Sequence, residues 1–158
     1  MSHRQRALNE VWFAAQPPQH PHVLQYSNAW EEHGYLFIQT ELCEVGSLKD
    51  LLERRNGNPL PEETIWEYLL DMALGLKHIH MHNLLHLDIK PANLFLTVEG
   101  HLKIGDFGLV QHLGAGDSYE MEGDSRYMAL ELLSDAASVA FSADTFCLGA
   151  TCFEMVCV

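Results

Sequence analysis

Positive charge is scarce in this sequence. Only 9 lysine and arginine residues face 22 aspartate and glutamate residues, so the formal net charge at pH 7 is -13. An acidic surface repels phosphate backbones and anionic lipid headgroups. The charge balance therefore disfavours nucleic acid as a partner, and we expect no membrane contact from this segment.

Cysteine is also sparse, and its spacing does not suit a metal site. The 4 cysteines form no CxxC pair; they are Cys43, Cys147, Cys152 and Cys157. This pattern favours reduced thiols in a protein of the nucleus or cytoplasm, with a zinc site as the weaker alternative.

Long apolar runs are missing as well. The opening residues 1–10 are too polar for a secretory signal. The most apolar stretch, 140–158, is interrupted by Asp144 and Glu154, which is typical of a buried helix rather than of a membrane span. With 47% hydrophobic and 20% charged residues, the 158-residue chain has the composition of one globular domain.

The pattern of apolar residues, prolines and glycines predicts an α+β chain with two lobes and a site at their junction. The longest helix begins near Pro61, because Ile65, Leu69, Met72, Leu76 and Ile79 then recur at helical spacing. The other expected elements are a helix over 2–15, a hairpin of strands 22–30 and 35–42 with a turn at 31–34, a connector at 43–46, a short helix around 48–52, strands at 93–98 and 101–105, a loop at 113–125 and a helix from about 142.

Two short motifs carry the strongest functional signal. HLDIKPANLF occupies 86–95, and KIGDFG follows at 103–108. Identity, order and spacing match the catalytic loop and the DFG segment of protein kinases. A single aspartate in a loop is usually a solvated turn former, but the joint occurrence of these residues after a long helix indicates phosphoryl transfer.

The chemistry of phosphoryl transfer explains the residue types in these motifs, because positioning and charge neutralisation do most of the work. We expect Asp88 to accept the proton of the incoming hydroxyl and Lys90 to reach the transferring phosphate. Asn93 and Asp106 offer hard oxygen ligands suited to Mg2+. The sequence therefore predicts ATP and Mg2+ at one site.

From 7 to 156 the chain resembles the eukaryotic protein kinase family, and within it the Wee/Myt branch that inhibits cyclin-dependent kinases. The resemblance rests on ALNEVWFAA, HPHVLQYSNAWEE, FIQTELCEVGSL, HLDIKPANLFL and EGDSRYMALELL. It implies a partial kinase fold with a small-lobe remnant at 1–42, a hinge at 43–46 and a truncated large lobe at 47–158.

The resemblance also assigns further residues. Glu10 corresponds to the helix glutamate that normally pairs with a phosphate-binding lysine, and Thr40 to the gatekeeper beside the adenine pocket. Backbone groups of Glu41 and Cys43, which flank Leu42, would bond adenine. Structural support for the site would come from His86, Phe107, Gly108, Glu131 and Asp144.

Leu87 stands where many kinases have an arginine that grips a phosphorylated activation loop. Leucine cannot pair with phosphate. Our hypothesis is that the segment 114–127 adopts its working shape without phosphorylation.

Four histidines, His78, His80, His82 and His86, invite interpretation as a metal site, and His78 and His82 lie one helical turn apart. No HExxH pattern accompanies them, so structural or surface roles are favoured.

The family's Gly-rich loop and its phosphate-binding lysine have no counterpart before Glu10, and the sequence ends within the helix that contains Asp144. We therefore expect a fragment or an incomplete gene product. The expected consequences are an open strand edge at 35–42, an uncovered apolar face on the last helix and poor ATP affinity.

Two functions remain open from the sequence. The first is an ATP-dependent protein kinase with tyrosine or dual specificity, whose target by resemblance is a cyclin-dependent kinase controlling entry into mitosis. The second is a catalytically inactive truncated kinase, or pseudokinase, that acts as a binding module.

Overall fold

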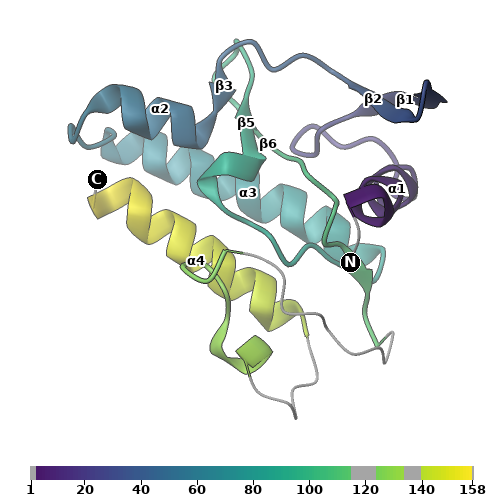
Figure 1. The fold of residues 1–158 in the computed structure, drawn as a ribbon. Coiled ribbons are helices and arrows are strands. Elements are labelled where there is room, and N and C mark those ends of the chain that lie inside the picture. Colours follow the sequence, from purple (N-terminus) through teal and green to yellow (C-terminus); the bar gives the residue numbers. More distant parts are fainter. Residues whose placement is uncertain (1–2, 115–123, 134–139, 158) are drawn as a thin grey trace.

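The computed structural model describes residues 3–114, 124–133 and 140–157. Helix α1 (His3–Ala14) lies beside the hairpin of β1 (Tyr26–Glu32) and β2 (Tyr35–Thr40), and together they form one side of the molecule (Figure 1). The other side contains α2 (Leu48–Arg55), α3 (Glu62–Met81) and α4 (Phe141–Cys157). The α+β class expected from the sequence is confirmed.

The hairpin turns tightly because two consecutive residues adopt left-handed backbone conformations. His33 has φ 52° and Gly34 has φ 79°, which matches the twist that a two-residue hairpin loop requires. Across the two strands Trp30 pairs with Phe37, and their rings stack with centroids 5.3 Å apart. The predicted hairpin is present, with β1 continuing through Glu32.

The first strand begins at Tyr26 rather than at the predicted His22. The preceding residues bond to β6 (Leu102–Ile104) instead: Leu24 N donates to Ile104 O at 2.8 Å, and Ile104 N donates to His22 O at 3.0 Å. This parallel contact joins the segment before the hairpin to the helical side. A sequence pattern of alternating residues does not reveal which neighbour a strand-like segment will choose.

Residues 46–47 form β3 (Gly46–Ser47), which pairs with β5 (Leu94–Leu96), and β5 pairs with β6. Ser47 then caps α2, because Asp50 N donates to Ser47 Oγ at 3.2 Å and Ser47 N donates to Asp50 Oδ2 at 2.9 Å. This reciprocal cap fixes the start of the helix directly after the strand.

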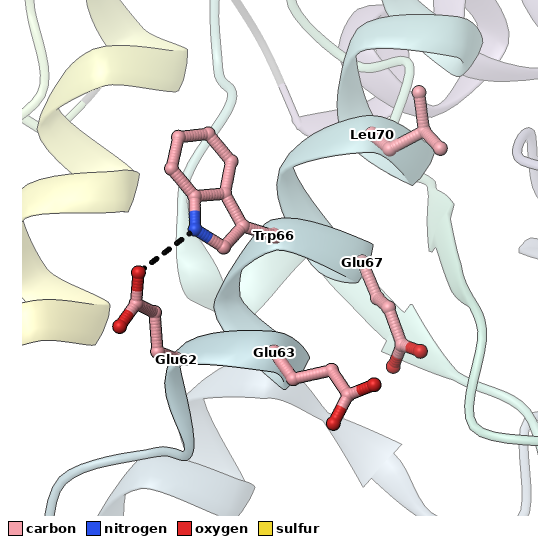
Figure 2. A pocket seen from close by; sticks show the side chains of 5 residues that line it. All are labelled: Glu62, Glu63, Trp66, Glu67 and Leu70. Atoms are coloured by element: carbon pink, nitrogen blue, oxygen red, sulfur yellow. Dashed lines mark hydrogen bonds between the residues drawn. The ribbon is translucent and has the colours of Figure 1, made fainter.

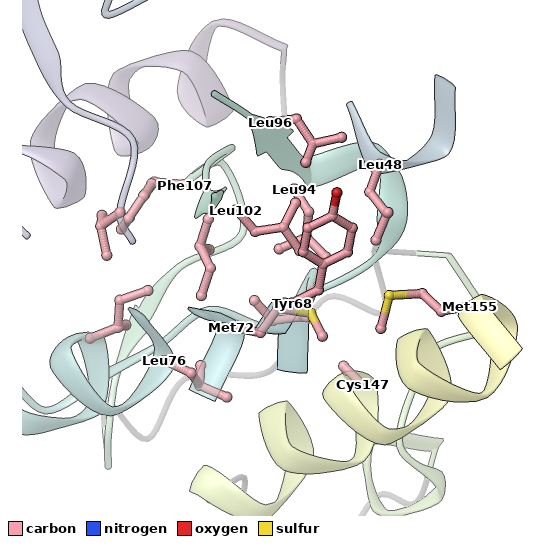
Figure 3. Packing of buried hydrophobic residues seen from close by; sticks show 14 of the residues in the cluster. Leu48, Tyr68, Met72, Leu76, Leu94, Leu96, Leu102, Phe107, Cys147 and Met155 are labelled. Carbon is pink, nitrogen blue, oxygen red and sulfur yellow. The ribbon is translucent and has the colours of Figure 1, made fainter. Parts of the chain in front are cut away.

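The predicted apolar stripe of α3 faces the core along its C-terminal half. Met72, Leu76 and Ile79 are buried, whereas the earlier members Ile65 and Leu69 are only partly covered. Figure 3 shows Cys147 and Met155 of α4 directed toward α3. The strand residues Leu94, Leu96, Leu102 and Ile104 and the motif residue Phe107 complete this core.

The exposed surface includes an open strand edge and an uncovered apolar helix face, as the sequence predicts. In the part of the chain that is described, β2 pairs with β1 alone, so its other edge is open. Helix α4 exposes Phe146, Phe153 and Val156. All four cysteines are free thiols, and no described helix has the length and apolar character needed to cross a membrane.

Gly75 allows a close approach that no other residue type would permit. A Cβ atom at this position of α3 would lie 2.4 Å from the carbonyl oxygen of His22. The same carbonyl accepts the hydrogen bond from Ile104, so it cannot move away freely. Gly149 in α4 has nothing within 4 Å of the corresponding position.

We predict opposite effects for alanine at these two helical glycines. Gly75→Ala should lower the free energy of unfolding by about 1–3 kcal/mol, because the added methyl group collides with backbone. Gly149→Ala should leave it unchanged or raise it by about 0.5–1 kcal/mol through helix propensity. Urea unfolding followed by circular dichroism measures both, and equal effects in the two variants would contradict the close packing of α3 on His22.

Candidate active site

The side chains of the first motif converge on the carboxylate of Asp88. Lys90 Nζ donates to Asp88 Oδ1 and Oδ2, each at 2.8 Å, and Asn93 Nδ2 donates to Oδ2 at 2.8 Å and to Asp88 O at 2.9 Å. Asp88 and Asn93 are buried, and Lys90 is partly exposed. The short helix η1 (Pro91–Asn93) turns the chain so that Asn93 can reach back to Asp88.

Asp144 of α4 holds the backbone of this loop in place. Its fully buried carboxylate accepts hydrogen bonds from His86 N at 2.8 Å and Leu87 N at 2.7 Å. Leu87 has φ 63°, a left-handed conformation that is rare for a branched side chain. The two backbone bonds to one carboxylate hold that strained turn, and Asp88 follows it directly.

His86 is completely buried between the two motifs. Asp88 N donates to His86 Nδ1 at 3.3 Å, so the proton lies on Nε2, which faces Gly105 O at 3.2 Å. Burial lowers the pKa of His86, which keeps the ring neutral in this tautomer. The ring also meets Phe107 edge to face, with centroids 5.4 Å apart.

The second motif is held against the first by backbone bonds. Gly105 N donates to Asn93 O at 2.9 Å, which places Asp106 directly beside the catalytic-loop residues. Asp106 has φ 63°, and its Oδ1 accepts from Gly108 N at 3.2 Å. The strained backbone of Asp106 resembles that of Leu87, and such outliers concentrate at functional sites.

A cavity of about 550 Å3 lies next to Asp106. It takes residues from the α1–hairpin side, from the hinge and from the helical side; the lining includes Glu10, Leu24, Tyr26, Ile38, Thr40, Glu41, Leu42, Cys43, Ser47, Asp50, Phe95 and Asp106. Its volume is within the range of small-molecule sites. The structure thus gathers Glu10, Thr40, Glu41, Cys43 and Asp106, all predicted from the sequence, around one space.

The side chain of Glu41 anchors the hinge, a role that the sequence did not indicate. Glu41 Oε1 accepts from Gln25 N at 2.7 Å and from Lys103 Nζ at 3.0 Å, and Glu41 N donates to Gln25 O at 2.9 Å. Lys103 is largely buried in this pair. These bonds fix the backbone of the hinge where it lines the cavity.

Glu10 has a tyrosine as its partner. Tyr26 Oη donates to Glu10 Oε1 at 2.6 Å. Burial raises the pKa of Glu10, the hydrogen bond from Tyr26 opposes that rise, and the negative charge of Asp106 adds to it. Glu10 is therefore an acidic group held at the cavity wall by a neutral donor.

The remaining predicted residues lie on the helical side. Glu131 belongs to η2 (Leu130–Leu133), where Ser142 Oγ donates to it at 3.3 Å, and Leu130 is exposed.

Hydrogen bonds from Arg126 lower the pKa of Asp124 to about 2. The hypothesis about the activation segment concerns 114–127, most of which lies outside the described residues.

The histidines have structural contacts. His78 Nε2 lies 2.9 Å from Pro18 O, His82 Nδ1 lies 2.9 Å from His78 O, and His80 Nε2 lies 2.8 Å from Asp144 Oδ2. The contact of His80 with Asp144 was not foreseen. Among the described residues no group of three or more histidine, cysteine, aspartate or glutamate side chains could hold a metal ion.

A second cavity, of about 610 Å3, lies on the outer face of α3 near its N-terminus. Figure 2 shows Trp66 and Leu70 there, with Trp66 Nε1 donating to Glu62 Oε1 at 3.3 Å. None of the residues predicted to act in catalysis or binding lines it. Five of the predicted residues line the other cavity instead: Glu10, Thr40, Glu41, Cys43 and Asp106.

The donor set beside that cavity fits a hard divalent cation. The amide nitrogen of Asn93 donates to Asp88, so the side-chain oxygen of Asn93 takes no part in that contact. The carboxylate of Asp106 is partly exposed. Carboxylate and amide oxygens are the ligands that Mg2+ takes in proteins, usually together with phosphate oxygens and water.

Comparison with known proteins identifies relatives along the whole chain. The protein kinase domain family matches residues 1–158. A probable protein kinase of Dictyostelium discoideum is 46% identical, over 98% of this chain and 44% of that protein. The mitosis inhibitor protein kinase wee1 of Schizosaccharomyces pombe is 43% identical, over 96% of this chain and 17% of that protein.

A membrane-associated tyrosine- and threonine-specific cdc2-inhibitory kinase of Caenorhabditis elegans is also similar, with 41% identity over 87% of this chain and 20% of that protein. The chain thus spans less than half the length of each of these relatives.

We predict that Asp144→Asn weakens both the fold and the site. The amide nitrogen cannot accept, so one of the backbone donors at His86 and Leu87 loses its partner. An unsatisfied buried donor costs about 1–3 kcal/mol, and chemical denaturation measures this loss. Thr145→Ala, which alters an exposed neighbour on α4, is the matched control and should change stability by less than about 0.5 kcal/mol.

Proposed function

The chain belongs to the protein kinase family, and we propose that it forms the catalytic centre of an ATP-dependent protein kinase. One observation carries the proposal. The carboxylate of Asp88 is held by Lys90 and Asn93 at 2.8 Å. The backbone bond from Gly105 N to Asn93 O joins this group to the segment of Asp106, which lines a cavity of about 550 Å3. This arrangement combines a proton acceptor (Asp88), a positive charge (Lys90) and two oxygen ligands on neighbouring segments (Asn93 and Asp106).

Asp88 is the proposed proton acceptor. Of its two carboxylate oxygens, Oδ2 receives bonds from both Lys90 and Asn93, whereas Oδ1 receives one from Lys90. Oδ1 is therefore the oxygen with room to accept the proton of a substrate hydroxyl. The bonds from Lys90 and Asn93 keep the carboxylate in one orientation, which is the main contribution that a protein makes to phosphoryl transfer.

Lys90 acts on the other reactant in this proposal. Its ammonium group lies beside Asp88 and can neutralise charge on the phosphoryl group as it moves. In the transfer, the hydroxyl oxygen forms a bond to the γ-phosphorus, and the bond from that phosphorus to the bridging oxygen of ADP breaks. The hydroxyl proton passes to Asp88 Oδ1, so atoms and charge balance.

Mg2+ is the implied cofactor, with Asn93 and Asp106 as its protein ligands. When bound it would neutralise phosphate charge and orient the nucleotide. The protein fixes both ligands, because Asn93 is bonded to Asp88 and the carboxylate of Asp106 is bonded by Gly108 N.

The hinge supplies the proposed adenine contacts. Glu41 N already donates a hydrogen bond to Gln25 O, and Cys43 O accepts one from Gly46 N at 3.1 Å. The amide N–H of Cys43 forms no hydrogen bond within the described part of the chain. It can therefore donate to a base. The carbonyl of Glu41 accepts from Thr40 Oγ1 at 3.1 Å, and its second lone pair can accept from an exocyclic amine.

We propose a cyclin-dependent kinase as the substrate, modified on tyrosine or on both tyrosine and threonine so that entry into mitosis is restrained. The support is the similarity to relatives whose names describe mitosis inhibition and cdc2-inhibitory activity. The proposed location is the nucleus or cytoplasm.

A second candidate function is a binding module without catalysis. It is favoured by the partner of Glu10, which here is Tyr26 rather than a lysine. In kinases the corresponding glutamate forms an ion pair with a lysine that binds the ATP phosphates. A protein that binds a cyclin-dependent kinase with equal affinity in the presence and absence of ATP, and transfers no phosphate, would support this alternative.

We predict that Asp88→Asn abolishes phosphate transfer while the protein still binds nucleotide. In the protein at its full natural length, assayed on a cyclin-dependent kinase with Mg2+ and ATP, the rate should fall at least about 100-fold, because the general base is lost.

The exposed substitution Glu53→Gln on α2 is the control and should leave the rate unchanged. Undiminished transfer by the Asp88→Asn variant would overturn the assignment of the base.

A further inference from the structure

We propose that the hydroxyl of Tyr26 is a positioning group that fixes Glu10 at the cavity. Tyr26 is neither part of a catalytic motif nor one of the residues predicted to act in the site. The significance for catalysis rests on the proposed kinase function, whereas the bond between Tyr26 and Glu10 is a property of the fold alone.

The geometry shows that one side chain serves two purposes. The Tyr26 hydroxyl donates to Glu10 Oε1 at 2.6 Å, which is the short distance typical of a hydrogen bond to a charged acceptor. The face-and-edge contact of its ring with Phe107 has centroids 5.9 Å apart and an interplanar angle of 83°. Tyr26 therefore bonds α1 with its polar end and packs on the DFG segment with its apolar body.

A phenylalanine at this position would provide the ring contact but not the bond. Another polar connection between α1 and the hairpin is the exposed pair of Arg4 and Glu31 at 3.1 Å. Exposed pairs contribute little to stability. The partly buried bond from Tyr26 is therefore the contact that sets where the carboxylate of Glu10 points.

The electrostatic environment keeps this donor in place. Burial and the charge of Glu10 raise the pKa of Tyr26 far above its ordinary value, so the phenol stays protonated at neutral pH. Hydrogen bonding to the charged form of a carboxylate favours ionisation. The bond from Tyr26 therefore offsets part of the rise that burial causes in the pKa of Glu10.

The contacts continue from Phe107 into the catalytic loop. Phe107 packs on His86 at 5.4 Å, and the backbone of His86 is bonded to Asp144. A displacement of α1 that pulled Tyr26 away would uncover one side of Phe107. We infer that loss of the hydroxyl loosens α1 first and weakens nucleotide binding as a consequence, without unfolding the helical side.

The test is Tyr26→Phe in the protein at its full natural length. Hydrogen exchange of the α1 amides should accelerate by about fivefold or more, while the amides of α3 keep their protection. The KM for ATP should rise about tenfold, the size expected for loss of one bond to a charged group, with a smaller change in kcat. Tyr35→Phe, at an exposed tyrosine of β2, is the matched control and should change neither quantity.

A double-variant cycle separates positioning from general damage. In a Glu10→Ala background, Tyr26→Phe should have no further effect on α1 exchange or on the KM, because the acceptor is already gone. Additive effects, or normal α1 exchange in Tyr26→Phe, would overturn the inference. If no variant and no wild-type protein transfers phosphate, the proposed function fails, and the exchange measurements still decide the role of Tyr26.

Discussion

The bond between the buried carboxylate of Asp144 and the backbone of His86 and Leu87 is the constraint on which the site depends. A left-handed turn at Leu87 is unfavourable, and two charge-assisted bonds of 2.7 and 2.8 Å hold it. The turn places Asp88 where Lys90 and Asn93 donate hydrogen bonds to it. A helix near the end of the chain thereby determines the geometry of a loop 57 residues earlier.

A series of ring contacts connects the loop that contains His86 to the α1–hairpin side of the molecule. His86 contacts Phe107, Phe107 contacts Tyr26, and Tyr26 bonds Glu10 of α1. His86 and Phe107 are fully buried, and the bond between Tyr26 and Glu10 is partly buried, so solvent competes little with these contacts. The α1–hairpin side and the helical side are coupled through the DFG segment.

The negative charges that line the cavity explain why the proposed site would require cations. Glu10, Glu41 and Asp106 all line the cavity, and the chain as a whole is acidic. Lys103 neutralises Glu41 at 3.0 Å, and Lys90 neutralises Asp88. In the proposed mechanism Asp106 is the carboxylate that would hold a metal ion beside a phosphate-bearing ligand. An acidic chain can therefore serve an anionic nucleotide.

The sequence by itself determined the local features: the helix around Met72 and Leu76, the hairpin at His33–Gly34 and the spacing that brings Asp88 and Asn93 together. Periodicity, turn chemistry and short spacing act over a few residues, so a linear pattern contains them. Only the tertiary structure decided that β1 begins at Tyr26, and that Tyr26 bonds Glu10. These depend on contacts between segments far apart in the chain, and many pairings are compatible with the same local pattern until the core has packed.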